Sequence, residues 1–251
     1  MRRGSTLKKY IYFIVGYKGD NIYPHGTGFF YKSNEGYKFI TAKHSVSDVN
    51  TFNKETLINK YDFIGIVYTD TISKTFAFIR LDIRLVKPLL PNTYFYETPD
   101  IIVFDLIGLK LNIKIYPIND LLPKPSTVDK KFDKIIIWGY PFSESPPPGF
   151  PIDSVKAKRY EGKFADVSHL DPYYPPNSKL YSVIQPEVIQ GMSGAPVFFK
   201  YYSGKGNAKT EIYEFAGLLF GTNVPYKAGY VHTYDATMAE IVKVTLFKYT
   251  F

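Results

Sequence analysis

Short runs of aromatic and β-branched residues recur along the chain, and this pattern constrains the fold more than any other feature. The runs are rich in Ile, Val, Phe and Tyr, and Gly, Pro, Asn or Asp residues separate them. Few of them show the 3.6-residue period of an amphipathic helix. We therefore expect an all-β protein with strands at 10–17, 26–32, 37–42, 63–68, 75–85, 101–109, 112–116, 134–139, 180–184, 195–201, 211–220 and 229–234.

A polar stretch that contains prolines divides these runs near the middle of the chain. It covers residues 117–131 and includes Pro123 and Pro125. With about six strands on each side, the pattern favours two packed six-stranded antiparallel β-barrels, and a single sandwich is the alternative. We expect an N-terminal barrel at 1–116, a linker at 117–131 and a C-terminal barrel at 132–251.

The end of the chain predicts the one helix. Asp235 is a residue type that caps helices, and apolar Met238, Ile241 and Val242 follow it at helical spacing. The expected architecture is thus a pair of barrels followed by a C-terminal helix.

Composition excludes several classes of chemistry. The chain has no cysteine, so a disulfide framework, a thiolate nucleophile and a cysteine-bound zinc site are ruled out. None of the four histidines forms the i, i+4 pair of a helical zinc motif. We expect neither a metal nor a cofactor, and any nucleophile has to be an oxygen.

Charge and hydropathy give less information about partners. The formal charge of +8 comes from Lys and Arg residues scattered along the chain, which is typical of a solvated surface. We therefore expect no nucleic-acid partner. Residues 1–17 resemble a signal peptide only superficially, and no run approaches a membrane span. These features favour a cytoplasmic protein, with secretion by another route and the oligomeric state left open.

One turn has the form of a nucleophile site. It is Gly191-Met192-Ser193-Gly194-Ala195-Pro196-Val197. Glycine on both sides of the serine permits positive φ angles and close approach, so that the hydroxyl can project from the turn beside backbone N–H groups. This is the layout of an acyl-transfer site.

Two upstream residues supply the other groups that a serine nucleophile needs. His44 ends the apolar run 39–42, and Asp100 opens the strand-like run 101–105. A serine hydroxyl is a weak nucleophile at neutral pH, so it requires an imidazole to take its proton and a carboxylate to orient that imidazole. Each residue alone is typical of an ordinary packed, capping or turn position, but the three together predict a protease-type site.

These segments resemble the trypsin-like (chymotrypsin-fold) serine peptidases, in particular the bacterial, archaeal and viral HtrA-like branch, here without a PDZ domain. The similar segments are Gly26–Phe30 (Gly-x-Gly-Phe), Ile40–His44 (Leu-Thr-Ala-x-His), Asp100–Val103 (Asp-x-Ala-Val), Ile137–Pro141 (Gly-x-Pro) and Gly191–Val197 (Gly-x-Ser-Gly-Gly-Pro-Val). The resemblance implies a serine endopeptidase with two barrels and a cleft between them. It assigns the general base to His44, the orienting acid to Asp100, the nucleophile to Ser193 and the oxyanion hole to the N–H groups of Gly191 and Ser193.

The sequence departs from the family at three points. Met192 replaces an acidic residue that serves zymogen activation, so we expect no activation by N-terminal clipping. Ala195 replaces a second glycine. The spacing from His44 to Asp100 is long, 100 − 44 = 56 residues, which leaves rivals for the acid role. These rivals are Asp62, Asp70, Asp82 and Asp105, of which Asp105 points to the opposite face of its strand from Asp100.

The substrate pocket is less well defined by the sequence. Glu187 lies near the position of the pocket floor in the family, where a carboxylate would favour Lys or Arg, although a surface glutamate is an equal interpretation. His232 resembles a pocket histidine of glutamine-specific viral members, but it is offset by one residue, which turns a strand side chain to the other face. The remaining pocket candidates are Gln190, Leu219, Phe220 and Gly221, in or near the expected substrate-pairing strand 217–221.

The sequence thus predicts an endopeptidase that acts on protein or peptide substrates through an acyl-enzyme. A catalytically silent module of the same fold that binds peptides or protein partners is the alternative. A basic nucleic-acid-binding protein ranks last, because the chain lacks an aromatic and basic recognition motif.

Overall fold

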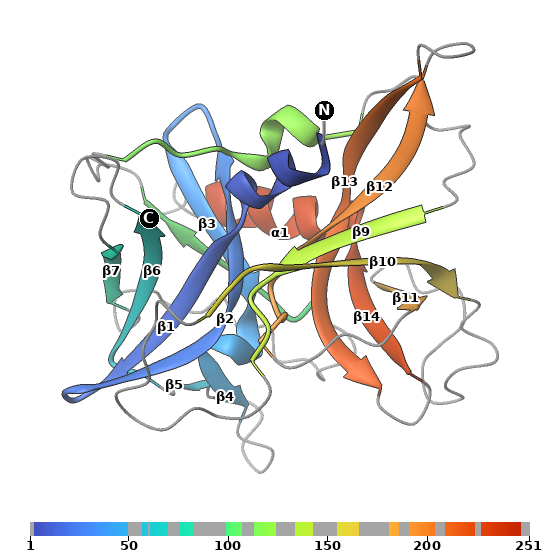
Figure 1. The fold of residues 1–251 in the computed structure, drawn as a ribbon. Coiled ribbons are helices and arrows are strands. Elements are labelled where there is room, and N and C mark those ends of the chain that lie inside the picture. The colour runs from blue at the N-terminus through green and yellow to red at the C-terminus, as the bar shows by residue number, and fades with distance from the viewer. Residues whose placement is uncertain are drawn as a thin grey trace.

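The computed structural model describes residues 3–49, 57–59, 61–69, 76–82, 99–106, 113–123, 134–142, 155–165, 181–185, 191–203, 209–223 and 227–246. Strands dominate these residues, and within them one α-helix follows the last strand (Figure 1). The expected all-β class with a C-terminal helix is confirmed.

The first six-stranded sheet comes from the N-terminal half. Its strands pair antiparallel in the order β7-β6-β1-β2-β3-β8. The 3₁₀ helix η1 (Arg3–Tyr10) precedes this sheet, and a two-stranded ribbon, β4-β5, accompanies it. The bounds are β1 (Tyr12–Lys18), β2 (Asn21–Lys32), β3 (Tyr37–Ala42), η2 (Lys43–Ser45), β4 (Ser47–Val49), β5 (Leu57–Asn59), β6 (Phe63–Thr69), β7 (Phe76–Asp82), β8 (Ile101–Asp105) and η3 (Ile118–Leu121).

The second sheet comes from the C-terminal half and closes on itself. Its order is β10-β11-β14-β13-β12-β9, and every neighbouring pair is antiparallel. The expected pair of six-stranded antiparallel units is therefore present. The second is a closed barrel, whereas the described strands of the first form a sheet with β7 and β8 at its two ends. The bounds are β9 (Lys134–Gly139), β10 (Lys158–Ala165), β11 (Tyr181–Gln185), β12 (Pro196–Ser203), β13 (Thr210–Asn223), β14 (Ala228–Thr233) and α1 (Tyr234–Leu246).

Two local predictions were wrong. Residues 113–116 of the expected strand 112–116 form no strand, because Tyr116 donates its N–H to the hydroxyl of Tyr12 at 3.2 Å instead of to a ladder partner. Helix α1 is capped by Thr233 rather than Asp235. The Thr233 hydroxyl accepts the N–H of Ala236 at 3.3 Å, which places the helix start ahead of Asp235.

A shared hydrophobic core joins the two sheets and fixes where their residues meet. It contains Phe29 and Ile40 from the first sheet and Phe198, Phe215 and Leu218 from the second, all fully buried. The Phe29 and Phe215 rings lie 5.2 Å apart. Because such interiors are close-packed, loops from both halves that border this core are held in a defined relation.

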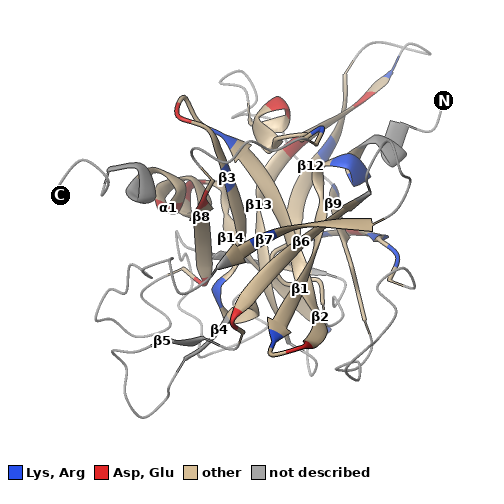
Figure 2. Ribbon diagram, turned by 90° about the vertical axis from the view of Figure 1, so that its left-hand side faces the viewer, with Lys and Arg blue, Asp and Glu red and all other residues tan. Residues whose placement is uncertain are grey.

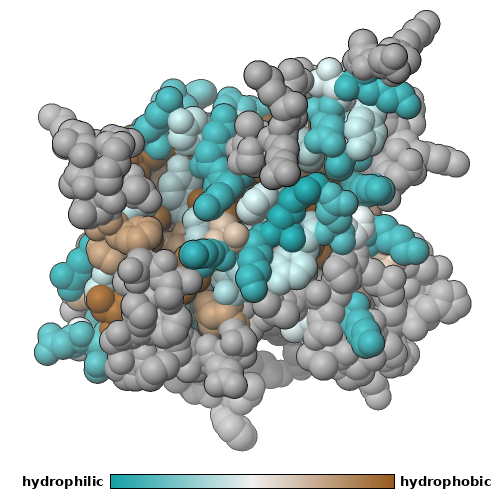
Figure 3. All heavy atoms as spheres, in the orientation of Figure 1, coloured by the Kyte–Doolittle hydropathy of each residue, from teal (hydrophilic) through white to brown (hydrophobic). Residues whose placement is uncertain are grey.

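The surface is mixed in character. Lys and Arg residues of the described part are spread over several elements (Figure 2). Apolar atoms show beside β6 and β7 (Figure 3), where Phe76 is 48% exposed and Phe78 is 38% exposed. Among the described residues, no helix has the length and apolar character needed to cross a membrane.

Candidate active site

Ser193 lies in a tight turn directly before strand β12, as its glycine-flanked sequence predicts. Gly191 and Gly194 have φ angles of +88° and +86°, in the region that favours glycine. The N–H of Ala195 donates to the carbonyl of Met192 at 2.9 Å and closes the turn. A Cβ at Gly194 would lie 2.0 Å from the carbonyl oxygen of Thr27, so no larger residue fits there without a backbone shift.

Thr27, on β2 of the first sheet, bonds this turn of the second half to the first half of the protein. Its N–H donates to the carbonyl of Ser193 at 2.9 Å, and its hydroxyl donates to the carbonyl of Gly191 at 3.1 Å. The same hydroxyl accepts the N–H of Tyr140 at 2.9 Å, and the Thr27 carbonyl accepts the hydroxyl of Thr41 at 2.8 Å. Sequence reasoning missed this role, although the centre of the Gly26-Thr27-Gly28 motif was its signal.

Strand β13 of the second sheet bonds to the other side of the turn. The N–H of Gly194 donates to the carbonyl of Leu219 at 2.7 Å, and the N–H of Leu219 donates to the carbonyl of Ala195 at 2.9 Å. The turn is therefore bonded to a strand of each sheet. Such double attachment fixes the Ser193 backbone before any ligand binds.

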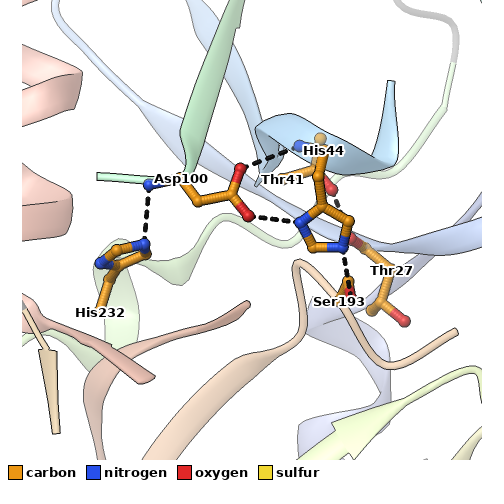
Figure 4. Close-up of polar contacts among 6 residues, drawn as sticks. All are labelled: Thr27, Thr41, His44, Asp100, Ser193 and His232. Carbon is orange, nitrogen blue, oxygen red and sulfur yellow. Dashed lines mark hydrogen bonds and ion pairs between the residues drawn. The ribbon is translucent and has the colours of Figure 1, made fainter. Parts of the chain in front are cut away.

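His44 projects from η2, directly after β3, towards Ser193 (Figure 4). Its Nε2 lies 2.9 Å from the Oγ of Ser193, and its Nδ1 contacts the Oδ2 of Asp100. The three side chains form one continuous hydrogen-bonded line, although His44 and Ser193 are 149 residues apart. The His44 side chain is 37% exposed and Ser193 is partly exposed, so a ligand can reach the serine end of the line.

Asp100 lies just before β8 and is buried, with 4% of the residue exposed. Its Oδ1 accepts the backbone N–H of His44 at 2.9 Å. Burial alone would raise the pKa of the Asp100 carboxyl, but the charge of His44 and the hydrogen bonds from His44 outweigh that cost and hold this pKa below its ordinary value. The carboxylate is therefore ionised at neutral pH and accepts a proton-bearing Nδ1.

This arrangement determines the tautomer of His44. With the proton on Nδ1 facing the carboxylate, Nε2 carries the lone pair and accepts the hydroxyl proton of Ser193. The line can thus draw a proton away from Ser193 and return it. That is the capability which activation of a serine hydroxyl requires.

The rival carboxylates have other partners or lie outside the described residues. Asp105 forms an ion pair with the fully buried Lys38 at 3.4 Å, and Asp62 accepts the N–H of Gly19 at 3.1 Å. Asp70 and the side chain of Asp82 lie outside the described residues. Asp100 is the carboxylate that contacts Nδ1 of His44.

The expected oxyanion donors are the N–H groups of Gly191 and Ser193. A trans peptide directs its N–H opposite to its C=O, so the bond from Met192 C=O to Ala195 also sets the direction of the Ser193 N–H. The positive φ of Gly191 brings its backbone into the same turn. Both groups lie in the turn that carries the serine hydroxyl.

The pocket candidates are only partly described. Glu187 and Gln190 lie outside the described residues. Leu219 is fully buried, and Phe220 is 8% exposed. Gly221 pairs with Tyr230, and a β-bulge separates it from Leu219.

His232 lies beside Asp100 in the structure. Its Nε2 accepts the backbone N–H of Asp100 at 2.8 Å, on the far side of Asp100 from His44 (Figure 4). Its ring stacks on Phe220 with centroids 3.9 Å apart. Sequence reasoning selected this histidine but not its contact with Asp100, which lies 132 residues away along the chain.

Within the part of the chain that the structure describes, no group of His, Asp and Glu side chains has the arrangement of a metal site.

Comparison with solved structures identifies the fold. The chain is similar to an inactivated protease paralogue of the scabies mite, S-I1 (16% identity, TM-score 0.53, 96% of each chain covered). It is also similar to protease Anisep from Arthrobacter nicotinovorans (14% identity, TM-score 0.50, 90% of each chain covered). A third similar structure is the catalytically active tobacco etch virus protease with product (10% identity, TM-score 0.50, 95% of this chain and 79% of that chain covered). No protein-family model and no curated protein sequence matches the chain.

The chain therefore has the chymotrypsin-like fold of the trypsin-like serine proteases, as its motifs predict. At these identities the likeness establishes the fold alone. The fold does not decide activity, because one of the similar structures is an inactivated protease. Function has to be argued from the residues of the site.

Proposed function

We propose that this protein is a serine endopeptidase in which Ser193 is the nucleophile, His44 the general base and Asp100 the acid that orients it. The observation that carries the proposal is the continuous line from Asp100 through His44 to Ser193, with 2.9 Å between His44 Nε2 and Ser193 Oγ. That distance lies within the range in which a base removes a proton directly.

The first half of the reaction forms an acyl-enzyme. The Oγ of Ser193 attacks the carbonyl carbon of the scissile peptide bond while its proton passes to Nε2 of His44. The resulting imidazolium is stabilised by the buried Asp100 carboxylate, which stays ionised. When the C–N bond breaks, His44 gives its proton to the leaving amine.

The second half restores the enzyme. A water molecule attacks the acyl ester and passes a proton to Nε2 of His44, and His44 returns a proton to Ser193 as the acid product leaves. During both halves negative charge develops on the carbonyl oxygen. The N–H groups of Gly191 and Ser193 would donate to that oxygen, a contribution of about 3 to 4 kcal/mol for one such donor in a related reaction.

The substrate class that fits this chemistry is a peptide or protein. Tobacco etch virus protease, which has a similar fold, is described in complex with its product. No metal ion or cofactor has a role in the proposed steps. Peptide-bond hydrolysis by a serine needs only the nucleophile, the base, its orienting acid and the oxyanion donors.

A cleavage assay on a denatured proteome tests the proposal. New peptide N-termini are counted after incubation with the wild-type protein, with S193A and with the matched control S203A, whose serine ends β12 away from His44. We expect new termini with a shared sequence preference for the wild type and for S203A, and none above background for S193A. Equal cleavage by S193A and the wild type would refute the assignment of Ser193.

The silent peptide-binding module is the second candidate, and the inactivated mite paralogue is the observation that favours it. The intact line of His44, Asp100 and Ser193 argues against it, because a silent relative is free to lose any of the three. Absence of cleavage by a folded wild-type protein would favour the silent module.

A further inference from the structure

Each of the four polar groups of Asp100 has a partner, and one of these partners comes from the other half of the protein. The carbonyl accepts the N–H of Lys43 at 3.2 Å, Oδ1 accepts the N–H of His44 at 2.9 Å, and Oδ2 contacts the His44 ring. These three bonds lead to η2, the short 3₁₀ helix directly after β3 of the first sheet. The fourth runs from the Asp100 N–H to Nε2 of His232, at 2.8 Å, in the second sheet.

The ring of His232 is held in a defined orientation. The residue is 4% exposed and stacks on Phe220 at an interplanar angle of 17°. Phe220 lies at the β-bulge of β13 between Leu219 and Gly221, a device that redirects a side chain. Phe220 also stacks on Tyr230, which precedes His232 by two residues on the same face of β14.

The hydrogen bond specifies the chemical state of this ring. A nitrogen that accepts an N–H bond carries a lone pair, so His232 is neutral at Nε2 and holds its proton on Nδ1. The Asp100 carboxylate is a charged group near this ring. Phe220 of β13 stacks on the ring, and Tyr181 is the Cα partner of His232 on β11. A proton on Nε2 would leave the buried N–H of Asp100 facing another donor.

We propose that His232 is a positioning residue that fixes Asp100, and through it His44, by accepting the Asp100 N–H. This role rests on the proposed function. The nucleophile comes from the second sheet, whereas the base and its acid come from the first. The bond from the Asp100 N–H to His232 and the bond from the Thr27 N–H to the Ser193 carbonyl both join the first half to the second, so together they fix the acid relative to the nucleophile.

A pair of amide variants tests the acceptor directly. The side-chain amide of H232Q reaches the place of Nε2 and offers an oxygen there, whereas the shorter amide of H232N reaches only the place of Nδ1. We expect H232Q to retain most of the wild-type kcat. We expect H232N to lose about 10- to 100-fold in kcat, which is the loss that a displacement of a site residue by about 1 Å causes. KM should stay nearly unchanged in both variants. Circular dichroism and the midpoint of thermal unfolding establish that each variant is folded.

A second measurement needs no activity and so separates this inference from the proposed function. In uniformly ¹⁵N-labelled S193A protein, long-range ¹H–¹⁵N correlation spectra report the tautomer of each histidine ring. We expect the Nδ1–H tautomer for His232 and a scalar coupling across the hydrogen bond from the Asp100 amide to His232 Nε2. The measurement also decides the case in which H232N does not fold.

The outcomes are distinct. A proton on Nε2 of His232 together with no coupling to Asp100 overturns the inference. A folded H232N with the kcat of the wild type also overturns it. So does a folded H232Q whose kcat is as low as that of H232N. If the wild type cleaves nothing while the coupling is present, the proposed function fails, and the effect of His232 on catalysis fails with it. Rescue of kcat by Gln but not by Asn, with the Nδ1–H tautomer, supports the inference.

Discussion

The backbone N–H of Thr27 donates to the carbonyl of Ser193 at 2.9 Å, and this bond joins the first sheet to the turn that carries the proposed nucleophile. The hydroxyl of Thr27 adds two further bonds, to the Gly191 carbonyl and from the Tyr140 N–H. One buried residue therefore holds three points of the second half of the protein.

Removal of the Thr27 hydroxyl is predicted to loosen the turn. T27V has nearly the same shape but leaves the Gly191 carbonyl and the Tyr140 N–H without this partner, which costs about 2 to 4 kcal/mol of unfolding free energy. T27S keeps the hydroxyl and serves as the matched control. Urea unfolding measures the stability. Equal stability of T27V and T27S would show that the hydroxyl bonds do not hold the turn.

A methyl group at Gly194 is predicted to abolish activity. Its Cβ would lie 2.0 Å from the Thr27 carbonyl oxygen and 2.3 Å from the Thr41 hydroxyl, so the backbone of the turn has to move. G19A is the control, because Gly19 also has a positive φ, of +58°, but nothing lies within 4 Å of its Cβ position. G19A should lose only about 1 kcal/mol of stability and keep its peptidase rate. A fully active G194A would contradict the described turn.

We expect the orienting role to belong to Asp100 and not to Asp105, which lies five residues further along. D100N reverses the hydrogen-bonding preference at His44 Nδ1 and should lower kcat by about 10⁴-fold, as it does in a well-studied enzyme with this triad. D105N weakens the ion pair with buried Lys38, so it should lose stability while the kcat of the folded protein is kept. Steady-state kinetics on folded samples separates the two. A greater loss of kcat in D105N would transfer the acid role.

The lowered pKa of Asp100 predicts a specific dependence of stability on pH. Because the folded-state pKa lies below that of the unfolded chain, the carboxylate contributes stability above its unfolded pKa of about 3.9, and this contribution is lost as the pH falls through the folded-state pKa. D100N lacks this contribution at every pH. Urea unfolding between neutral and strongly acidic pH should therefore show a steeper acid loss for the wild type than for D100N. Parallel curves would contradict the assignment.

Local signals in the sequence led to the three residues that the structure brings into one hydrogen-bonded line. Ser193 stands between glycines, His44 ends an apolar run and Asp100 opens another. By contrast, strand β10 was missed because its exposed side chains, such as Arg159 and Glu161, replace the apolar pattern by which strands were sought.

The cross-sheet contacts could not be predicted in the same way. The bond from Thr27 to Gly191 spans 164 residues, and the bond from Asp100 to His232 spans 132. Such contacts depend on how two sheets pack over Phe29 and Phe215, and no short motif records that packing. Strand register and packing, rather than residue type, determine which side chain accepts the N–H of Asp100.

Covalent labelling with a fluorophosphonate, followed by peptide mapping, tests the central claim most directly, because the reagent reacts with an activated serine and not with an ordinary one. We predict one adduct per molecule, located on Ser193, that is absent from S193A and present in S203A. An adduct elsewhere, or none on a folded wild-type sample, would contradict the claim that the imidazole of His44 activates this hydroxyl.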